Sequence, residues 1–138
     1  MDSLNWSAII AMTVVNFVFG HLWFGVFFGK QWQRIHGVDG MNEKTKKEMM
    51  KGMWKIMVSE LVSTFFIMTG LAWVIYEVPE YSGIQNALIL WIVFVLPISI
   101  SNVIWGADKR EYMIGKIAIN IGGRLIPMII AGYVLTQF

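Results

Sequence analysis

The 138-residue chain has no cysteine and little charge, since Asp, Glu, Lys and Arg together make up only 14% of it. Without cysteine it has neither a disulfide scaffold nor thiolate metal ligands. A soluble domain carries about 25% charged residues, so the low share argues against a water-soluble globular protein. Because 57% of the residues are hydrophobic, the composition also excludes intrinsic disorder. These properties are typical of an integral membrane protein.

Four apolar segments are long enough to cross a bilayer as helices, which takes about 20 residues each. They cover residues 4–28, 56–76, 84–105 and 112–136. The first and third carry no formal charge, the second carries only Glu60, and the fourth carries Lys116 and Arg124. The alternating pattern of a transmembrane β-strand is not visible. The sequence therefore predicts an all-α integral membrane protein, a single domain built as a bundle of four antiparallel transmembrane helices.

The basic residues are confined largely to two of the connections between these segments. The first connection holds most of them: Lys30, Arg34, Lys44, Lys46, Lys47, Lys51 and Lys55. The third connection adds Lys109 and Arg110, whereas the N-terminal tail carries only Asp2 and the second connection carries Glu77 and Glu80. Because Lys and Arg in short loops stay on the cytoplasmic side, we expect a multi-pass protein of the cell membrane with both termini outside.

The first connection also predicts a basic interfacial helix before the second span. Asn42 is a favourable residue for capping the start of such a helix, which we expect to run directly into the span. Apolar residues then follow at helical spacing, and lysines occupy the other side: Met49, Met50, Met53, Trp54 and Met57 against Lys44, Lys47, Lys51 and Lys55. A helix of this kind lies in the membrane interface with its lysines toward anionic headgroups. We therefore expect the bilayer, including its anionic lipids, to be a partner.

Two stretches carry a resemblance to a known family. The first reads Asn5-Trp6, Asn16, Gly20, Trp23-Phe24, Phe28-Gly29-Lys30 and Trp32, and the second contains Trp91, Phe94, Asn102 and Trp105. Their order resembles the N-terminal signature and the third helix of the domain of unknown function 1761 family. The resemblance implies a small four-span membrane protein along the whole chain. Since the family has no assigned activity, it implies no catalytic residues.

Polar residues lie inside all four predicted spans at matching depths. With a rise of about 1.5 Å per residue, three of them lie roughly 6 to 8 Å inside the cytoplasmic end: Glu60, Asn102 and Lys116. At about 12 to 14 Å lie His21, Thr64 and Asn120, and at about 18 to 20 Å lie Asn16 and Arg124. Ionisable groups in a bilayer usually face a bundle interior or a wet cavity. We therefore expect these eight residues to form one inward-facing polar cluster.

The charges of this cluster leave two alternatives open. Lys116 and Arg124 give two positive charges against the single negative charge of Glu60. In the first alternative Arg124 and Glu60 form a structural ion pair, and the protein is a non-catalytic membrane scaffold or a lipid-interacting subunit. In the second, the positive excess receives a small anion or polar solute from the cytoplasm. The leading hypothesis is accordingly a small channel, permease or solute-binding protein. Because four short helices enclose little volume, passage of anything beyond an ion or a very small solute would need a homo-oligomer.

Motifs for catalysis, cofactors and nucleic acid are lacking. The sequence contains neither a phosphate-binding loop nor a nucleophile elbow. His21 and Glu60 are the sole acid–base candidates, so an enzyme is a third hypothesis. Because His36 falls in the predicted cytoplasmic turn, it cannot bind the same buried metal ion or haem as His21. We expect no metal, no cofactor and no nucleic-acid partner, because the lysines are explained by membrane topology.

Overall fold

The computed structural model describes residues 4–106 and 110–138, and within these residues it is helical, without strands. Asp2 and Lys109, which contribute to the predicted charge asymmetry, lie outside the described residues. In chain order the elements are α1 (Trp6–His21), the π-helical segment η1 (Leu22–Phe27), α2 (Gly29–Ile35), α3 (Glu43–Lys51), α4 (Met53–Glu77), α5 (Gly83–Leu90), the π-helical segment η2 (Trp91–Val95), α6 (Leu96–Ile104), the short 3-10 helix η3 (Arg110–Tyr112) and α7 (Met113–Leu135).

Four continuous helical stretches in the described chain are long and apolar enough to cross a membrane. They are Trp6–Phe27, Met53–Glu77, Gly83–Ile104 and Arg110–Leu135. The four predicted spans are thereby confirmed, with boundaries that differ by a few residues. Helix boundaries depend on caps as well as on hydropathy, and this accounts for the small differences.

Short polar side chains set several of the helix starts. The side chain of Asn5 accepts a hydrogen bond from the backbone N–H of Ala8 at 3.1 Å, which caps α1. Asn42 accepts from the N–H of Thr45 at 2.9 Å, so its predicted capping role is confirmed. The expected helix before the second span forms as α3, but Gly52 separates it from α4. Glycine has the highest backbone entropy of all residues, so a break at this position is physically reasonable.

The third span changes its helical geometry in the middle. Residues Trp91–Val95 form the π-helical segment η2, and Pro97 stands in the first turn of α6 that follows. Proline has no N–H to donate to the carbonyl four residues earlier, and its ring crowds that carbonyl. A wider π turn directly before it accommodates both effects. Neither η2 nor the π-helical segment η1 of the first span was predicted from the sequence.

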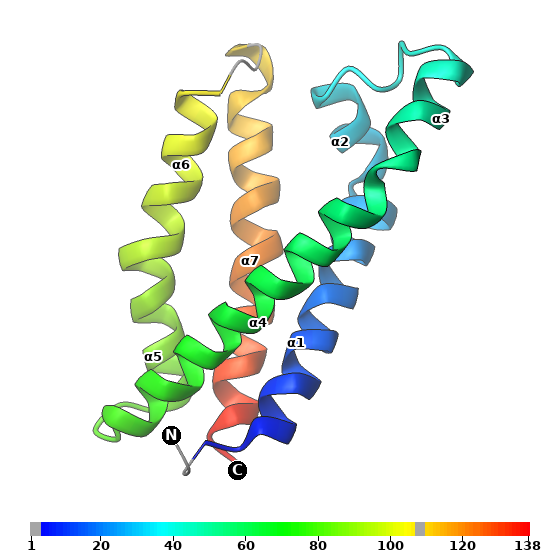
Figure 1. Cartoon of the computed structure of the whole chain (residues 1–138). Helices are drawn as coiled ribbons and strands as arrows, with labels where there is room; N and C mark the ends of the chain where they lie inside the picture. The colour runs from blue at the N-terminus through cyan, green and yellow to red at the C-terminus, as the bar shows by residue number, and fades with distance from the viewer. Residues whose placement is uncertain (1–3, 107–109) are drawn as a thin grey trace.

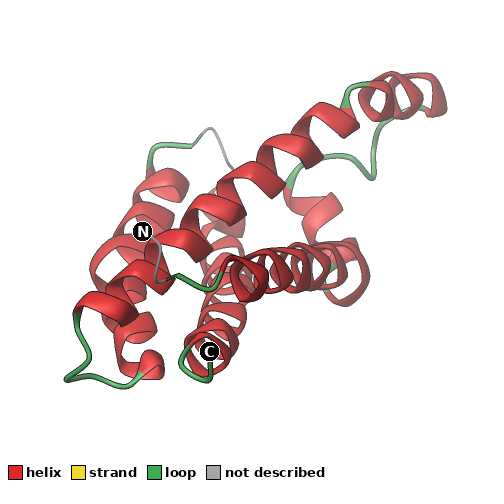
Figure 2. Ribbon diagram, turned by 60° about the horizontal axis from the view of Figure 1, so that its bottom comes forward, coloured by secondary structure: helices red, strands yellow, loops and turns green. Residues whose placement is uncertain are grey.

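The spans run alternately up and down in Figure 1, so that α1 begins and α7 ends at the lower end of the molecule. Helices α2 and α3 lie at the opposite end, which we call the α3 end. Helix α4 crosses the molecule obliquely, and Figure 2 shows α3 projecting beyond the other helices at its far end.

The buried core lies toward the lower end. Its cluster consists of Ile9, Met12, Met68, Leu71, Ala72, Ala87 and Ala131. Helices α5 and α7 approach there backbone to backbone, since a Cβ atom added to Gly83 would collide with the carbonyl oxygen of Gly132. The buried residues of α1 all precede Val14, and those of α4 all follow Ser63. The buried residues of α1 and α4 are therefore confined to the parts of these helices nearer the lower end.

Candidate functional site

One face of α7 carries three of the predicted site residues. Lys116, Asn120 and Arg124 follow one another every four residues and so lie along one side of the helix, and Met128 stands one further turn beyond Arg124. Near the lower end this face is covered, since Met128 is only 5% exposed and Gly132 packs against α5. Arg124 is exposed, while Asn120 and Lys116 are half-buried. Along α7, the side chains on this side of the helix thus change from buried to exposed between Met128 and Arg124.

A groove begins at the same level. It has a volume of about 340 Å³, and it is lined by Phe66, Ile67, Gly70, Leu71, Trp73 and Val74 of α4, by Leu90, Phe94 and Val95 of the third span, and by Met128 of α7. These side chains are apolar throughout. Figure 1 shows α4 close to α5 at the lower end and diverging from α6 toward the α3 end. The groove lies along the part of α4 that follows Phe65, beside the end of α5 and the segment η2.

Glu60 and Thr64 lie on α4 above this groove, toward the α3 end. Thr64 is 6% exposed and is the first buried residue of α4, whereas Glu60, one turn earlier, is exposed. Glu60 precedes the groove residue Ile67 by seven positions and therefore shares its face of the helix. Among the described residues, an ion pair forms on α3, where Lys46 Nζ lies 3.6 Å from Glu43 Oε1. Glu60 and Arg124 form no ion pair within the described residues.

Asn102 occupies the corresponding place on α6. It is exposed, and it follows the groove residue Val95 by seven positions, while the adjacent Val103 is 1% exposed. Asn102 therefore stands on the same side of the third span as the groove wall.

The two residues of the first span are placed differently from each other. The half-buried Asn16 directs its side-chain amide toward the sulfur of Met68 on α4, with 3.7 Å between Nδ2 and Sδ. His21 is exposed, and its ring lies 5.9 Å from the ring of Phe17. Since five residues turn an α-helix by about 140°, His21 and Asn16 lie on different sides of α1. Leaving Lys116 aside, no hydrogen bond or ion pair joins two of the predicted site residues within residues 4–106 and 110–138.

The rotation of α7 is explained by a contact that the sequence analysis missed. The indole Nε1 of Trp23 donates a hydrogen bond to the carbonyl oxygen of Ile119 at 2.9 Å. Its ring lies directly over two glycines, because a Cβ atom on Gly122 or on Gly123 would come within 2.7 Å of ring atoms of Trp23. This contact holds the Ile119–Gly123 side of α7 against the first span. The face with Lys116 and Arg124 is consequently turned elsewhere; the adjacent pair of glycines was the available sequence signal.

Other polar groups offer no second site. In the described ranges no set of three His, Asp or Glu side chains is arranged to hold a metal ion. The buried Nε1 of Trp91 has no hydrogen-bond partner among the described residues. Another cavity, of about 310 Å³, lies at the lower end between the start of α1 and the end of α7. Polar groups of the predicted set do not line it.

Comparison with known proteins agrees with the architecture. The family model described as "Protein of unknown function (DUF1761)" matches residues 7–136, which is nearly the whole chain. Neither a curated protein nor a solved structure matches the chain. Four helices of membrane-spanning length and apolarity identify the chain as a multi-pass membrane protein.

Proposed function

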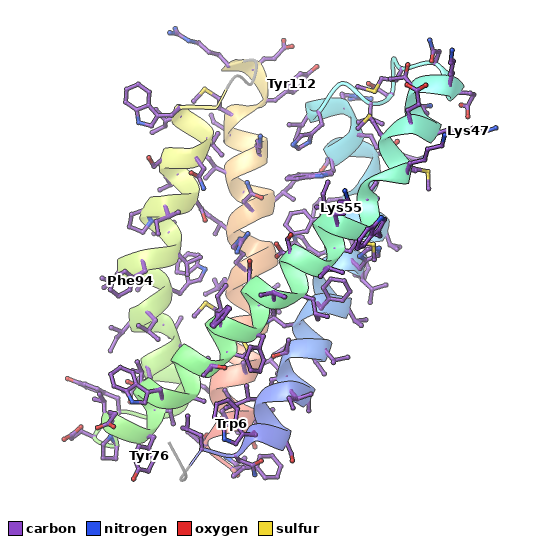
Figure 3. All side chains as sticks on the ribbon, in the orientation of Figure 1. Trp6, Lys47, Lys55, Tyr76, Phe94 and Tyr112 are labelled. Carbon is purple, nitrogen blue, oxygen red and sulfur yellow. The ribbon has the colours of Figure 1, made fainter. Side chains whose placement is uncertain are left out.

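The chain belongs to the family of the protein of unknown function DUF1761, and we propose that it binds a small anion or polar solute entering from the cytoplasm. In this proposal the four spans form one antiparallel domain in the cell membrane, with both termini outside. Figure 3 shows Trp6 and Tyr76 near one end of the molecule and Lys47 and Tyr112 at the other. Aromatic rings at both ends and lysines at one end are what a membrane protein with a cytoplasmic α3 end requires.

The exposed guanidinium of Arg124 carries the proposal. Arg124 stands at the middle of α7, about 16 Å from either end at 1.5 Å per residue. A charged side chain at that depth in lipid costs at least about 2.5 to 3.5 kcal/mol. In the part of the chain that the structure describes, Arg124 has neither a carboxylate partner nor a hydrogen-bond acceptor. A bound anion would offset this cost, and the exposure of Arg124 leaves it accessible to such an anion.

The chemistry of the face suits a carboxylate or a phosphate. A guanidinium binds either group through two parallel hydrogen bonds, and it stays charged at all physiological pH values. Asn120, one turn closer to the α3 end, adds an amide that donates hydrogen bonds. Lys116 continues the same face to the first turns of α7.

The test is anion binding by the reconstituted protein. We expect acetate or inorganic phosphate, titrated calorimetrically against the protein in lipid nanodiscs, to bind at least about tenfold more weakly to Arg124→Gln. Arg34→Gln removes an exposed positive charge of α2 and is the matched control, with unchanged affinity expected. If Arg124→Gln folds normally and binds both anions like the unaltered protein, the proposal is overturned.

A second candidate function is a lipid-interacting scaffold, and α3 favours it. Met50 is 67% exposed and Trp54 is 61% exposed, beside the lysines that run from Lys44 to Lys55. Such a surface binds the membrane interface without any solute site. In that case Arg124→Gln disturbs folding or assembly, and neither anion binds the unaltered protein. Under the leading proposal, transport of a solute would require a homo-oligomer, because the groove of one copy is open to the side.

A further inference from the structure

The anion-binding residue and the apolar groove adjoin each other on α7. Met128 lines the groove, and Arg124 lies one helical turn away on the same face. From the lower end toward the α3 end, α7 presents first Gly132, which packs against α5, then Met128 in the groove wall, and then Arg124. A charge one helical turn from a residue that lines an apolar groove complements a ligand that has one charged head and one hydrocarbon chain.

We propose that the groove holds the hydrocarbon chain of a long-chain carboxylate, a fatty-acid anion, whose carboxylate lies at Arg124. This inference rests on the proposed function, because Arg124 is the anion-binding residue in both. The groove's volume of about 340 Å³ falls within the range of roughly 300 to 1,000 Å³ typical of small-molecule sites. Its walls come from α4, the third span and α7, so a chain lying in it contacts three helices.

The depth of Arg124 favours a carboxylate over a phospholipid. At about 16 Å from the end of α7, the guanidinium lies well below the headgroup level, where the phosphate of a bilayer phospholipid remains. A carboxylate is a small head, and the polar face formed by Asn120 and Lys116 leads it inward. The chain would reach the groove from the surrounding lipid, because the groove is open at the surface of the molecule.

Gly70 permits a substitution that separates the chain site from the anion site. It lines the groove on α4, and a Cβ atom added there meets no other atom within 4 Å. Gly70→Leu therefore adds an apolar side chain at the groove wall, at a position where its Cβ atom is unobstructed, and on a different helix from Arg124. Gly115→Leu is the matched control, because Gly115 is exposed, has equally open space and lies outside the groove.

The experiment measures binding of palmitate and of acetate to the protein in nanodiscs, with empty nanodiscs giving the non-saturable partitioning of palmitate. A palmitate with bromine atoms on its chain reports the position of the chain, because it quenches nearby tryptophan fluorescence and Trp73 lines the groove. We expect Gly70→Leu to weaken palmitate binding at least about tenfold and to leave acetate binding unchanged. Gly115→Leu should leave both unchanged, Arg124→Gln should weaken both, and Trp73→Phe should remove the saturable quenching.

Each outcome decides one of the two proposals. If acetate binds through Arg124 but palmitate binds no more tightly, or if Gly70→Leu has no effect on palmitate, the fatty-acid site is overturned and the proposed function stands. If palmitate does not bind the unaltered protein, the fatty-acid site is overturned, and if acetate and inorganic phosphate also fail to bind, the proposed function is overturned with it.

Discussion

At the scale of single residues, the contact between Trp23 and α7 has the largest structural consequence. Its indole hydrogen bond to Ile119 and its packing over Gly122 and Gly123 set the rotation of the last helix. The directions in which the side chains of Asn120 and Arg124 leave α7 are set by that rotation. A change at Trp23 is thus expected to act on the candidate site at a distance.

Trp23→Phe tests this role. The substitution removes the hydrogen bond to the Ile119 carbonyl and leaves a gap over the two glycines, so we expect a loss of about 1 to 3 kcal/mol in the free energy of unfolding. The measurement is unfolding by denaturing detergent, followed by circular dichroism. Trp105→Phe is the control, because Trp105 is 87% exposed and its replacement should have little effect. Equal losses for the two variants would contradict the assigned role of Trp23.

At the scale of elements, α5 and α7 form the closest helix pair of the molecule's lower end. Glycine at positions 83 and 132 lets their backbones touch, and Ala87 fills the adjacent turn. Small residues at helix contacts replace the hydrophobic driving force that is absent in lipid. This pairing closes the lower end of the bundle, so the divergence of α4 opens only the other end.

Gly132→Ala should therefore weaken the pair. The added Cβ atom would collide with the carbonyl oxygen of Gly83 and lie 2.9 Å from the Cβ of Ala87, and such overpacking typically costs about 1 to 3 kcal/mol. Thermal unfolding in detergent measures the loss. Gly115→Ala, where the added methyl meets nothing within 4 Å, should be neutral or slightly stabilising. A neutral Gly132→Ala would show that the two backbones do not touch.

At the scale of the whole molecule, orientation in the membrane follows from charge. The basic residues gather at the α3 end, whereas the start of α1 and the end of α7 lie at the opposite end. A membrane protein arranged in this way keeps its basic end in the cytoplasm. Under the proposed function, this orientation would let a solute reach Arg124 from the cytoplasmic side.

The absence of cysteine makes orientation directly measurable, since single-cysteine variants carry no background label. In intact cells, a maleimide that does not cross membranes should label Gln137→Cys and leave Lys47→Cys unlabelled until the membrane is permeabilised. Both residues are exposed in the folded chain, so access is limited by the membrane alone. The reverse labelling pattern would invert the topology and place the groove's opening outside.

The sequence by itself determined that the chain has four membrane-spanning helices, because span length and hydropathy are local properties that add up along the chain. It also determined which residues are polar in the spans and, by the spacing of Lys116, Asn120 and Arg124, that three of them share a face. Only the tertiary structure decided where that face points and what lies beside it. Helix rotation and divergence depend on contacts between distant residues, such as Trp23 with Gly123 and Gly83 with Gly132. A periodic pattern within one helix carries no information about such contacts, so the groove below Arg124 emerged only from the fold.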